Sequence, residues 1–198
     1  MIDFENIKEE FIKNGGVLKT LELNKLGLTS RQIKNLLEDG KISKLKYGFY
    51  ELSDFFIQDE VIIARLFPDA VIFLESALLH YEYTDRIPAS WQIAVDKHSE
   101  KSKYKIDYPN IEPFYIEKKF MNIGLDHYKV DGFKINIFNR ERTICDVLKY
   151  ENKLDKEIFN KAVQNYLKDN KKNIKQLSEY SKLLKVKGKV KTYIGVWL

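Results

Sequence analysis

Four polar side chains that can read nucleic-acid bases lie close together near residue 31. Arg31 and Asn35 are one helical turn apart, and Gln32 and Lys34 flank them. Arginine, asparagine, glutamine and lysine hydrogen-bond base edges in a major groove or hold phosphates. The spacing predicts a recognition helix with a polar outer face. The alternative is the solvated face of an ordinary helical core.

A basic segment follows directly and could hold the phosphate backbone. Lys41, Lys44 and Lys46 precede the turn Tyr47-Gly48, and Phe49–Leu52 is typical of a return strand. Lysines on such a hairpin would contact phosphates, which gives affinity and register without sequence information. A hairpin of this size after a recognition helix predicts a wing.

The elements that position these side chains follow from apolar spacing and helix-end signals. Residues 3–14 have helical periodicity, with Asp3 as N-cap and Gly15-Gly16 as terminator. Thr20 is the expected N-cap of a short second helix whose apolar positions are Leu21, Leu23 and Leu26. Thr29 and Gln32 fit a capping box at the start of a third helix, about 30–39. We therefore expect a winged helix-turn-helix DNA-binding domain over 1–57.

The alternative is a winged helix that docks a protein. The candidate DNA-binding residues are Thr29, Ser30, Arg31, Gln32, Lys34, Asn35, Lys41, Lys44, Lys46 and Tyr47.

Composition narrows the remaining possibilities. The chain has 198 residues, 44% hydrophobic and 13% aromatic, which suffices for a packed core. The single cysteine, Cys145, excludes an intrachain disulfide, and the histidines have no metal-ligand spacing. No apolar run is long enough for a membrane span, and the acidic start, residues 1–5, is unlike a signal peptide. We expect a cytoplasmic protein without metal or cofactor.

Positive charge is concentrated near the two ends of the chain. The net charge is +5, with +4 in residues 17–50 and +8 in residues 149–198. This balance suits a polyanionic partner such as DNA. The lysines of the last segment predict a second polyanion-binding surface, and the alternative is a solvated face on packed helices.

Residues 58–198 are expected to form a second, α+β domain. A helix over 58–66 could bridge the domains, and a further helix is expected at 75–81. Short strands are predicted at 71–73, 90–95 and 114–116, and a hairpin flanks Asp131-Gly132. Helical periodicity follows at 140–150, 156–168, 174–185 and 189–197. Strands followed by helices indicate a small mixed or antiparallel sheet and a helical C-terminal part.

Three segments resemble AbiEi-type antitoxins in the order of that family. Gly27–Ile33, with Gly40–Ile42 and Tyr47–Tyr50, resembles its N-terminal domain. Glu75–Tyr81 is similar to the helix that starts its second domain. Asn139–Asp146 resembles its Glu-Arg-Thr-hydrophobic-x-Asp segment and is the most specific match.

The resemblance implies a transcriptional autorepressor and antitoxin of a type IV toxin–antitoxin system linked to abortive phage infection. Its winged helix would bind double-stranded DNA at inverted repeats upstream of its own operon. The C-terminal domain would counter an AbiEii-type nucleotidyltransferase toxin without forming a stable complex. The family includes regulators without an adjacent toxin gene, so a stand-alone regulator is the alternative. The family's second-domain motif corresponds here to Arg140, Glu141, Arg142, Thr143 and Asp146.

Two readings of that motif are open, and no catalytic residues are predicted. Arg142 and Asp146 could form a buried ion pair that fixes the domain, which we prefer, or act directly in antitoxicity. Asn139 could cap the helix. Glu117-Lys118-Lys119 fits half of a nuclease motif but lacks a convincing upstream aspartate. We expect a non-enzymatic protein with Cys145 in its core.

Overall fold

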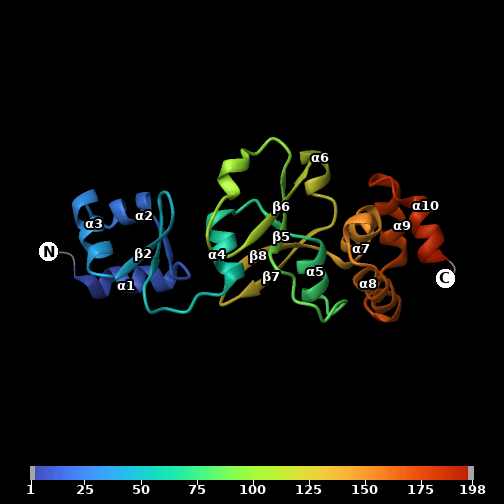
Figure 1. Ribbon diagram of the computed structural model, residues 1–198, viewed down its shortest axis with the longest axis horizontal. Coiled ribbons are helices and arrows are strands. Elements are labelled where there is room, and N and C mark those ends of the chain that lie inside the picture. The colour runs from blue at the N-terminus through green and yellow to red at the C-terminus, as the bar shows by residue number, and fades with distance from the viewer. Residues whose placement is uncertain (1–2, 196–198) are drawn as a thin grey trace. The chain divides into compact units, whose positions relative to one another are not determined.

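The computed structural model describes residues 3–195, which form an α+β structure with ten α-helices and two sheets (Figure 1). Two compact units divide it. The first contains the described residues up to Pro68, with Lys105–Pro109 and Lys129–Ile135. The second contains Asp69–Tyr104, Asn110–Tyr128 and the described residues from Asn136 onward. The division expected at 57/58 differs from this one, since helix α4 (Asp59–Leu66) belongs to the first unit.

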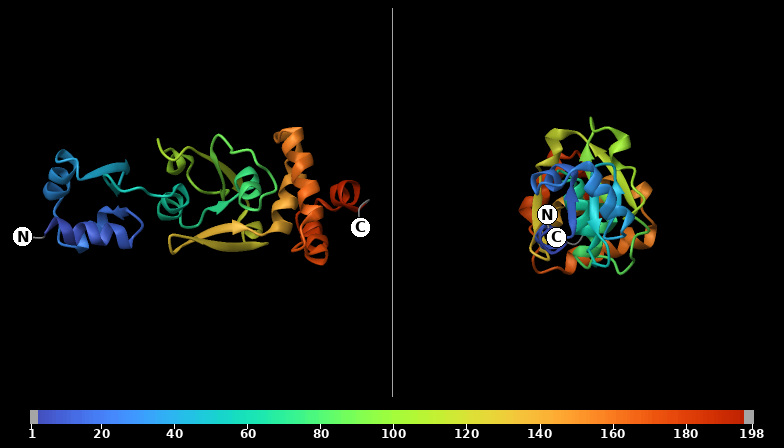
Figure 2. Two further views of the ribbon diagram at one scale, coloured as in Figure 1. Left: turned by 90° about the horizontal axis from the view of Figure 1, so that it is seen from below. Right: turned by 90° about the vertical axis from the view of Figure 1, so that its left-hand side faces the viewer.

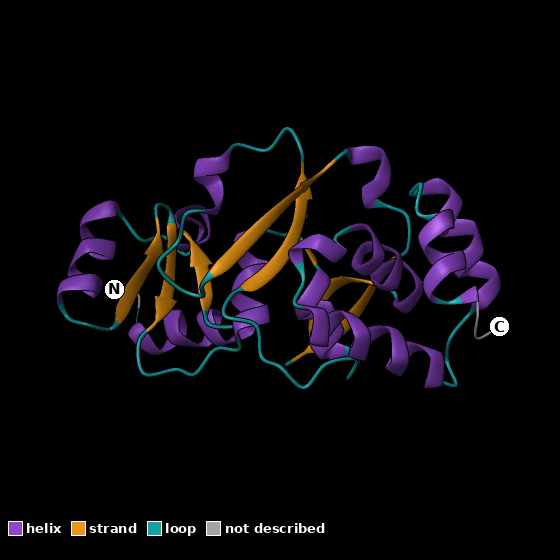
Figure 3. Ribbon diagram, turned by 45° about the vertical axis from the view of Figure 1, so that its right-hand side comes forward, coloured by secondary structure: helices purple, strands orange, loops and turns teal. Residues whose placement is uncertain are grey.

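The first unit carries three helices and a three-stranded sheet before α4. Its elements are α1 (Phe4–Lys13), β1 (Val17–Lys19), α2 (Thr20–Lys25), α3 (Ser30–Glu38), β2 (Ile42–Lys46) and β3 (Phe49–Leu52). The strand order is β1-β3-β2, and both pairings are antiparallel (Figure 3). The predicted helices and hairpin are confirmed. Strand β1 was not predicted, because three residues are too few to show a strand period.

Helix α2 begins differently from the expectation. Lys19 is its N-cap, and the Lys19 N–H donates to the Glu22 carboxylate at 2.7 Å. Thr20 is the first helical residue and cannot be the cap. Leu21, expected on the apolar face, is 71% exposed. Leu23 is fully buried among Phe11, Leu18 and the apolar side of α3. Helix α2 therefore contributes Leu23, and not Leu21, to the core of this unit.

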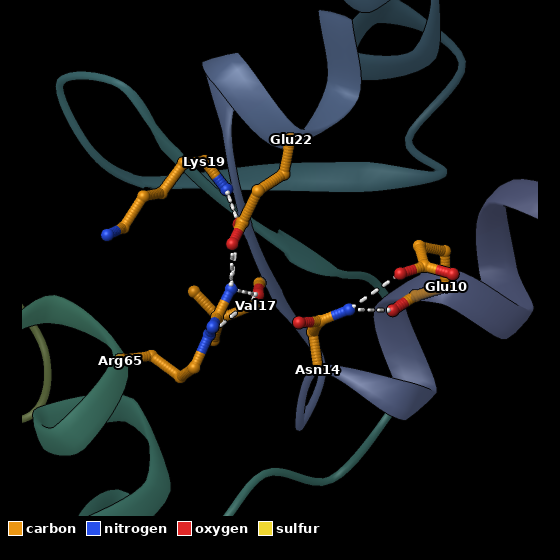
Figure 4. A network of polar contacts seen from close by, with 6 residues as sticks. All are labelled: Glu10, Asn14, Val17, Lys19, Glu22 and Arg65. Carbon is orange, nitrogen blue, oxygen red and sulfur yellow. Dashed lines mark hydrogen bonds and ion pairs between the residues drawn. The ribbon is translucent and has the colours of Figure 1, made fainter. Parts of the chain in front are cut away.

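A polar network attaches α4 to the start of α2 (Figure 4). Arg65 donates through Nε and Nη2 to the Val17 carbonyl at 3.2 and 3.0 Å. Its Nη2 also lies 2.7 Å from Glu22 Oε2. Burial raises the pKa of Glu22, but hydrogen bonds from the Lys19 N–H and from Arg65 outweigh it and hold that pKa below its ordinary value. This network explains why the helix expected to bridge two domains belongs to the first unit.

Acid should weaken this network. Because the folded state lowers the pKa of Glu22, its contribution to stability is complete above the unfolded value of 4.5 and disappears as pH falls through the folded value. Glu22→Gln should lower the free energy of unfolding at neutral pH by roughly 1 kcal/mol, since the ion pair is partly exposed. Urea titrations across this pH range should show a smaller acid-induced loss in the variant than in the wild type. Equal losses in the two proteins would contradict the assignment.

The second unit is built around a five-stranded mixed sheet of order β6-β5-β4-β8-β7. Its strands are β4 (Val71–Ile72), β5 (Trp91–Asp96), β6 (Ile111–Ile116), β7 (Leu125–Val130) and β8 (Phe133–Phe138), with the tip Lys129–Ile135 of the last two grouped in the first unit. Strand β4 runs antiparallel to β5 and parallel to β8, and β5 runs parallel to β6. Pro113 interrupts no inner ladder, because β6 is an edge strand.

In the second unit, the helices that were predicted from a long run of apolar residues at helical spacing lie close to their predicted bounds. They are α5 (Leu74–His80), α7 (Arg140–Lys149), α8 (Lys156–Lys168), α9 (Ile174–Leu183) and α10 (Lys187–Tyr193). The helix predicted to reach Trp197 extends in part beyond the described residues. Helix α6 (Lys118–Met121) and the 3₁₀ turns Lys101–Tyr104 and Glu151–Lys153 were not predicted, since each is about one turn long. Within residues 3–195, each helix is too short or too polar to cross a lipid bilayer.

Helix α7 is the centre of the C-terminal part. Eight of its residues, Glu141–Leu148, are buried, and it packs against α8, α9 and α10 (Figures 1 and 2). Its apolar residues Ile144, Val147 and Leu148 join the aromatic side chains Phe73 and Phe138 in one core. A helix that is buried on nearly every side must satisfy its polar groups internally.

Candidate nucleic-acid interface

Helix α3 presents the predicted polar face to solvent. Ile33 is buried and Leu36 and Leu37 are half-buried, so the helix packs on the side opposite Arg31 and Asn35. Those two side chains are exposed and lie one turn apart. Within residues 3–195, neither side chain makes a hydrogen bond or ion pair with the rest of the chain. They are therefore available to an external partner.

The start of α3 has the predicted capping box. The Thr29 N–H and hydroxyl each lie 2.9 Å from Gln32 Oε1, and Thr29 Oγ1 accepts from the Gln32 N–H at 3.4 Å. A glutamine needs its oxygen to contact adenine in the bidentate geometry. The capping box therefore uses the same oxygen that base reading by Gln32 would need. Thr29 and Ser30 remain exposed at the positive end of the helix dipole, where a phosphate is stabilised.

Loss of this cap should have a measurable cost. Replacing Thr29 with alanine removes the oxygen that accepts the Gln32 N–H, and we expect a loss of about 1 kcal/mol in the free energy of unfolding. Thr29→Ser keeps the hydroxyl and should stay close to the wild type. Urea denaturation followed by circular dichroism measures both. Equal stability of the alanine and serine variants would mean that the cap contributes little.

Lys34 and Lys41 each have an acidic neighbour. Lys34 Nζ lies 3.5 Å from Glu38 one turn later, and Lys41 Nζ lies 3.3 Å from Asp39. Both pairs are exposed, so each is weak and can exchange for a phosphate. These lysines suit backbone contacts better than base contacts.

The hairpin is short and its turn is held against α2. The Thr20 N–H donates to the Gly48 carbonyl at 3.0 Å, and Lys19 pairs with Phe49 next to the turn. The register shifts between Lys44 and Lys46, so Leu45 is an extra residue that points into the core. This bulge explains why apolar and polar residues alternate imperfectly in β2.

The hairpin residues differ in their availability. Tyr47 is 89% exposed at the tip, and Lys44 is exposed with its ammonium 5.7 Å from the Tyr47 ring centre. Lys46 is half-buried and lies 5.0 and 5.8 Å from the ring centres of Phe67 and Phe49. Of the predicted wing contacts, Lys44 and Tyr47 are accessible, and Lys46 mainly packs within the unit.

Four of the five residues of the second predicted motif are buried: Glu141, Arg142, Thr143 and Asp146. Arg142 and Asp146 are 1% and 2% exposed, and Arg142 Nε donates to Asp146 Oδ2 at 2.8 Å. Arg142 Nη1 also donates to the carbonyls of Phe120 and Ile123 at 2.6 Å. Burial raises the pKa of Asp146, and the arginine opposes that shift. The expected ion pair is therefore present and buried, and Asn139 caps α7 as expected.

The neighbours of this pair complete the motif. Glu141 accepts the Asn173 N–H at 2.7 Å, which places its carboxylate at the start of α9. Thr143 donates to the Phe138 carbonyl at 3.1 Å. Arg140 Nε donates to Asp169 at 2.9 Å, and Asp169 also accepts from the Tyr83 hydroxyl at 2.6 Å. The motif therefore joins β8, α7 and the α8–α9 connection.

Only glycine fits at position 124, because any side chain there would collide with Arg142. The φ of Gly124 is +71°, and a Cβ there would lie 2.4 Å from Arg142 Cβ. The glycine lets the chain bring the Ile123 carbonyl to the guanidinium.

The remaining candidates from the sequence are Cys145 and Glu117. Cys145 is fully buried, and burial raises the pKa of its thiol to about 12, as expected for a core cysteine. Glu117 precedes α6 and pairs with Lys119 at 2.7 Å on the surface. In the described part of the chain, no three His, Cys, Asp or Glu side chains gather as a metal ion would need.

One hollow surface of the second unit was not predicted. A cavity of about 600 Å³ is lined by residues of α8, by Lys172 and by Tyr193 of α10. Two of its residues, Lys168 and Lys172, belong to the lysine-rich segment expected to bind a polyanion, and the regular spacing of Asn160, Gln164 and Lys168 on α8 is a further signal in the sequence. Neither protein-family models nor curated proteins show a match to this chain.

Proposed function

We propose that the first unit is a winged helix-turn-helix domain and that the protein is a DNA-binding transcriptional repressor. Arg31 and Asn35 on α3 carry this proposal, because their side chains are exposed and have no partner among residues 3–195. Their one-turn spacing suits successive base edges, because arginine pairs with guanine and asparagine with adenine. The element order supports this assignment: three helices, a β1–β3 pairing and a hairpin directly after α3.

The charges around α3 support a duplex partner. Three exposed lysines lie within α3 or in the segment that follows it: Lys34, Lys41 and Lys44. Thr29 and Ser30 lie at the N-terminus of the helix. Cations and a helix N-terminus hold phosphates on either side of a groove, while α3 occupies it. The second unit contributes the +8 of residues 149–198, which adds a long-range attraction for DNA.

The resemblance to AbiEi-type antitoxins extends the proposal. The chain would repress its own operon at inverted repeats and counter an AbiEii-type nucleotidyltransferase toxin without a stable complex. The buried Arg142–Asp146 pair supports a role of that motif in holding the second unit together. Antitoxicity would then depend on exposed parts of the unit, and the motif would act through stability.

The first experiment is a titration of the purified full chain against the DNA upstream of its own gene. A shuffled duplex of the same length is the control, and both are measured at two salt concentrations. We expect preferential binding to the upstream DNA that persists at moderate salt. Equal and salt-sensitive binding to both duplexes would reduce the proposal to a basic surface. Absence of binding to either would favour a winged helix that docks a protein.

Co-expression tests the antitoxin role separately. A cell that carries an inducible AbiEii-type toxin should grow when the full chain is present and should stop growing without it. Arg31→Ala should retain this protection, because the proposed antitoxin activity does not use the DNA-reading face. Upstream-DNA binding without protection would identify a stand-alone regulator.

A further inference from the structure

The cavity of about 600 Å³ in the second unit has a lining of unusual composition. Six of its residues lie on one side of α8, and two come from outside that helix: Phe159, Asn160, Val163, Gln164, Leu167, Lys168, Lys172 and Tyr193. Two residues are lysines, two are amides, and two are aromatic, while none is acidic. The volume is within the usual range for sites that bind small organic groups.

The two lysines at the cavity have no carboxylate partner in the described part of the chain. Lys168 is exposed, and Lys172 Nζ donates only to the Asp169 carbonyl at 3.3 Å. The Asp169 carboxylate is already engaged by Arg140, by Tyr83 and by the Lys171 N–H. The cavity therefore has an uncompensated positive rim that favours an anion.

The aromatic wall of the cavity is held in place before any ligand arrives. The ring of Tyr193 packs on Phe159 edge-on, with the ring centres 5.0 Å apart. Its hydroxyl lies 3.5 Å from Glu151 at the other end. A ring fixed at both ends loses little freedom when a flat group packs against it. Asn160 and Gln164, one turn apart and exposed, add hydrogen-bond donors and acceptors.

We propose that this cavity binds single-stranded nucleic acid, with one base against the Tyr193–Phe159 wall and phosphates on Lys168 and Lys172. Base stacking on aromatic side chains beside a basic track is the general mode of single-strand binding. A polymer fits better than a free nucleotide, because lysines continue beyond the cavity along the chain, at 171, 175, 182, 185, 187 and 191. This site is separate from the duplex-reading face of α3, and its binding does not depend on the proposed repressor function.

Fluorescence anisotropy of the full chain with a short labelled single-stranded oligonucleotide tests the proposal. The double variant Lys168→Gln/Lys172→Gln should bind about tenfold more weakly or worse. Its slope of log affinity against log salt should fall by about 0.7 for each lost phosphate contact. The matched control Lys97→Gln/Lys101→Gln removes the same charge from exposed positions outside both the lining and the lysine run, and it should change affinity by less than about threefold. Equal losses in the two double variants would overturn a localised site.

Two further variants separate the site from folding and from the duplex interface. Gln164→Glu places a carboxylate at an exposed position in the cavity and should weaken binding about as much as the lysine pair, while Gln176→Glu on α9 should not. Arg31→Ala should leave single-strand affinity unchanged. If Arg31→Ala removes single-strand binding, or if a mononucleotide binds as tightly as the oligonucleotide, the proposal fails.

Discussion

Replacing Arg142 with alanine should lower the free energy of unfolding by about 3–5 kcal/mol, the largest effect expected from any single substitution in this chain. The variant leaves the Asp146 carboxylate buried without its cation. It also removes the donor that the Phe120 and Ile123 carbonyls share at 2.6 Å. Each buried acceptor without a partner adds a desolvation cost. Urea denaturation of the full chain, followed by circular dichroism, measures the loss.

Two comparisons isolate the cause of that loss. Lys156→Ala removes an exposed charge from the start of α8 and should change stability by less than about 0.5 kcal/mol. Arg142→Met with Asp146→Leu removes both charges and fills their volume, so it should recover part of the loss. Recovery should be incomplete, because the two carbonyls still lack a donor. If Arg142→Ala costs less than about 1 kcal/mol, the pair is not buried as described.

Local signals predicted the bounds and the packed side of α3. The Thr29–Gln32 spacing set the start of α3, and the positions of Ile33, Leu36 and Leu37 set which side packs, so the exposure of Arg31 and Asn35 followed. The same logic predicted α7 and its cap at Asn139. These features depend on residues within one or two turns of each other, where periodicity and capping rules are strongest.

Features that depend on distant residues were not predictable in this way. Arg65 lies 48 positions from Val17, and only the folded chain brings its guanidinium to the Val17 carbonyl. The packing of Lys46 on Phe67 and the grouping of α4 with the first unit have the same cause. Gln32 illustrates a different limit, since one residue fitted two predicted roles and the cap uses the oxygen that the second role needs.

Replacing Arg31 with alanine should weaken binding to the upstream DNA by about 1–3 kcal/mol and should narrow its advantage over shuffled DNA. Arg31 has no partner within the described chain, so its loss has no expected cost in folding. Arg31→Lys keeps the charge but loses the planar fork, and should fall between the wild type and alanine in discrimination. Titrations of both duplexes at one salt concentration give the discrimination directly.

The neighbours of Arg31 should respond differently, and this pattern is the sharper test of how α3 meets DNA. Lys34→Ala should weaken binding to upstream and shuffled DNA by similar factors, because a phosphate contact carries no sequence information. Gln32→Ala should reduce stability through the lost cap and leave discrimination between the duplexes nearly intact. Asn35→Ala, like Arg31→Ala, should act mainly on the upstream duplex. If Gln32→Ala abolishes discrimination while Arg31→Ala does not, the cap must open on DNA and the reading face of α3 is not the one exposed in the free protein.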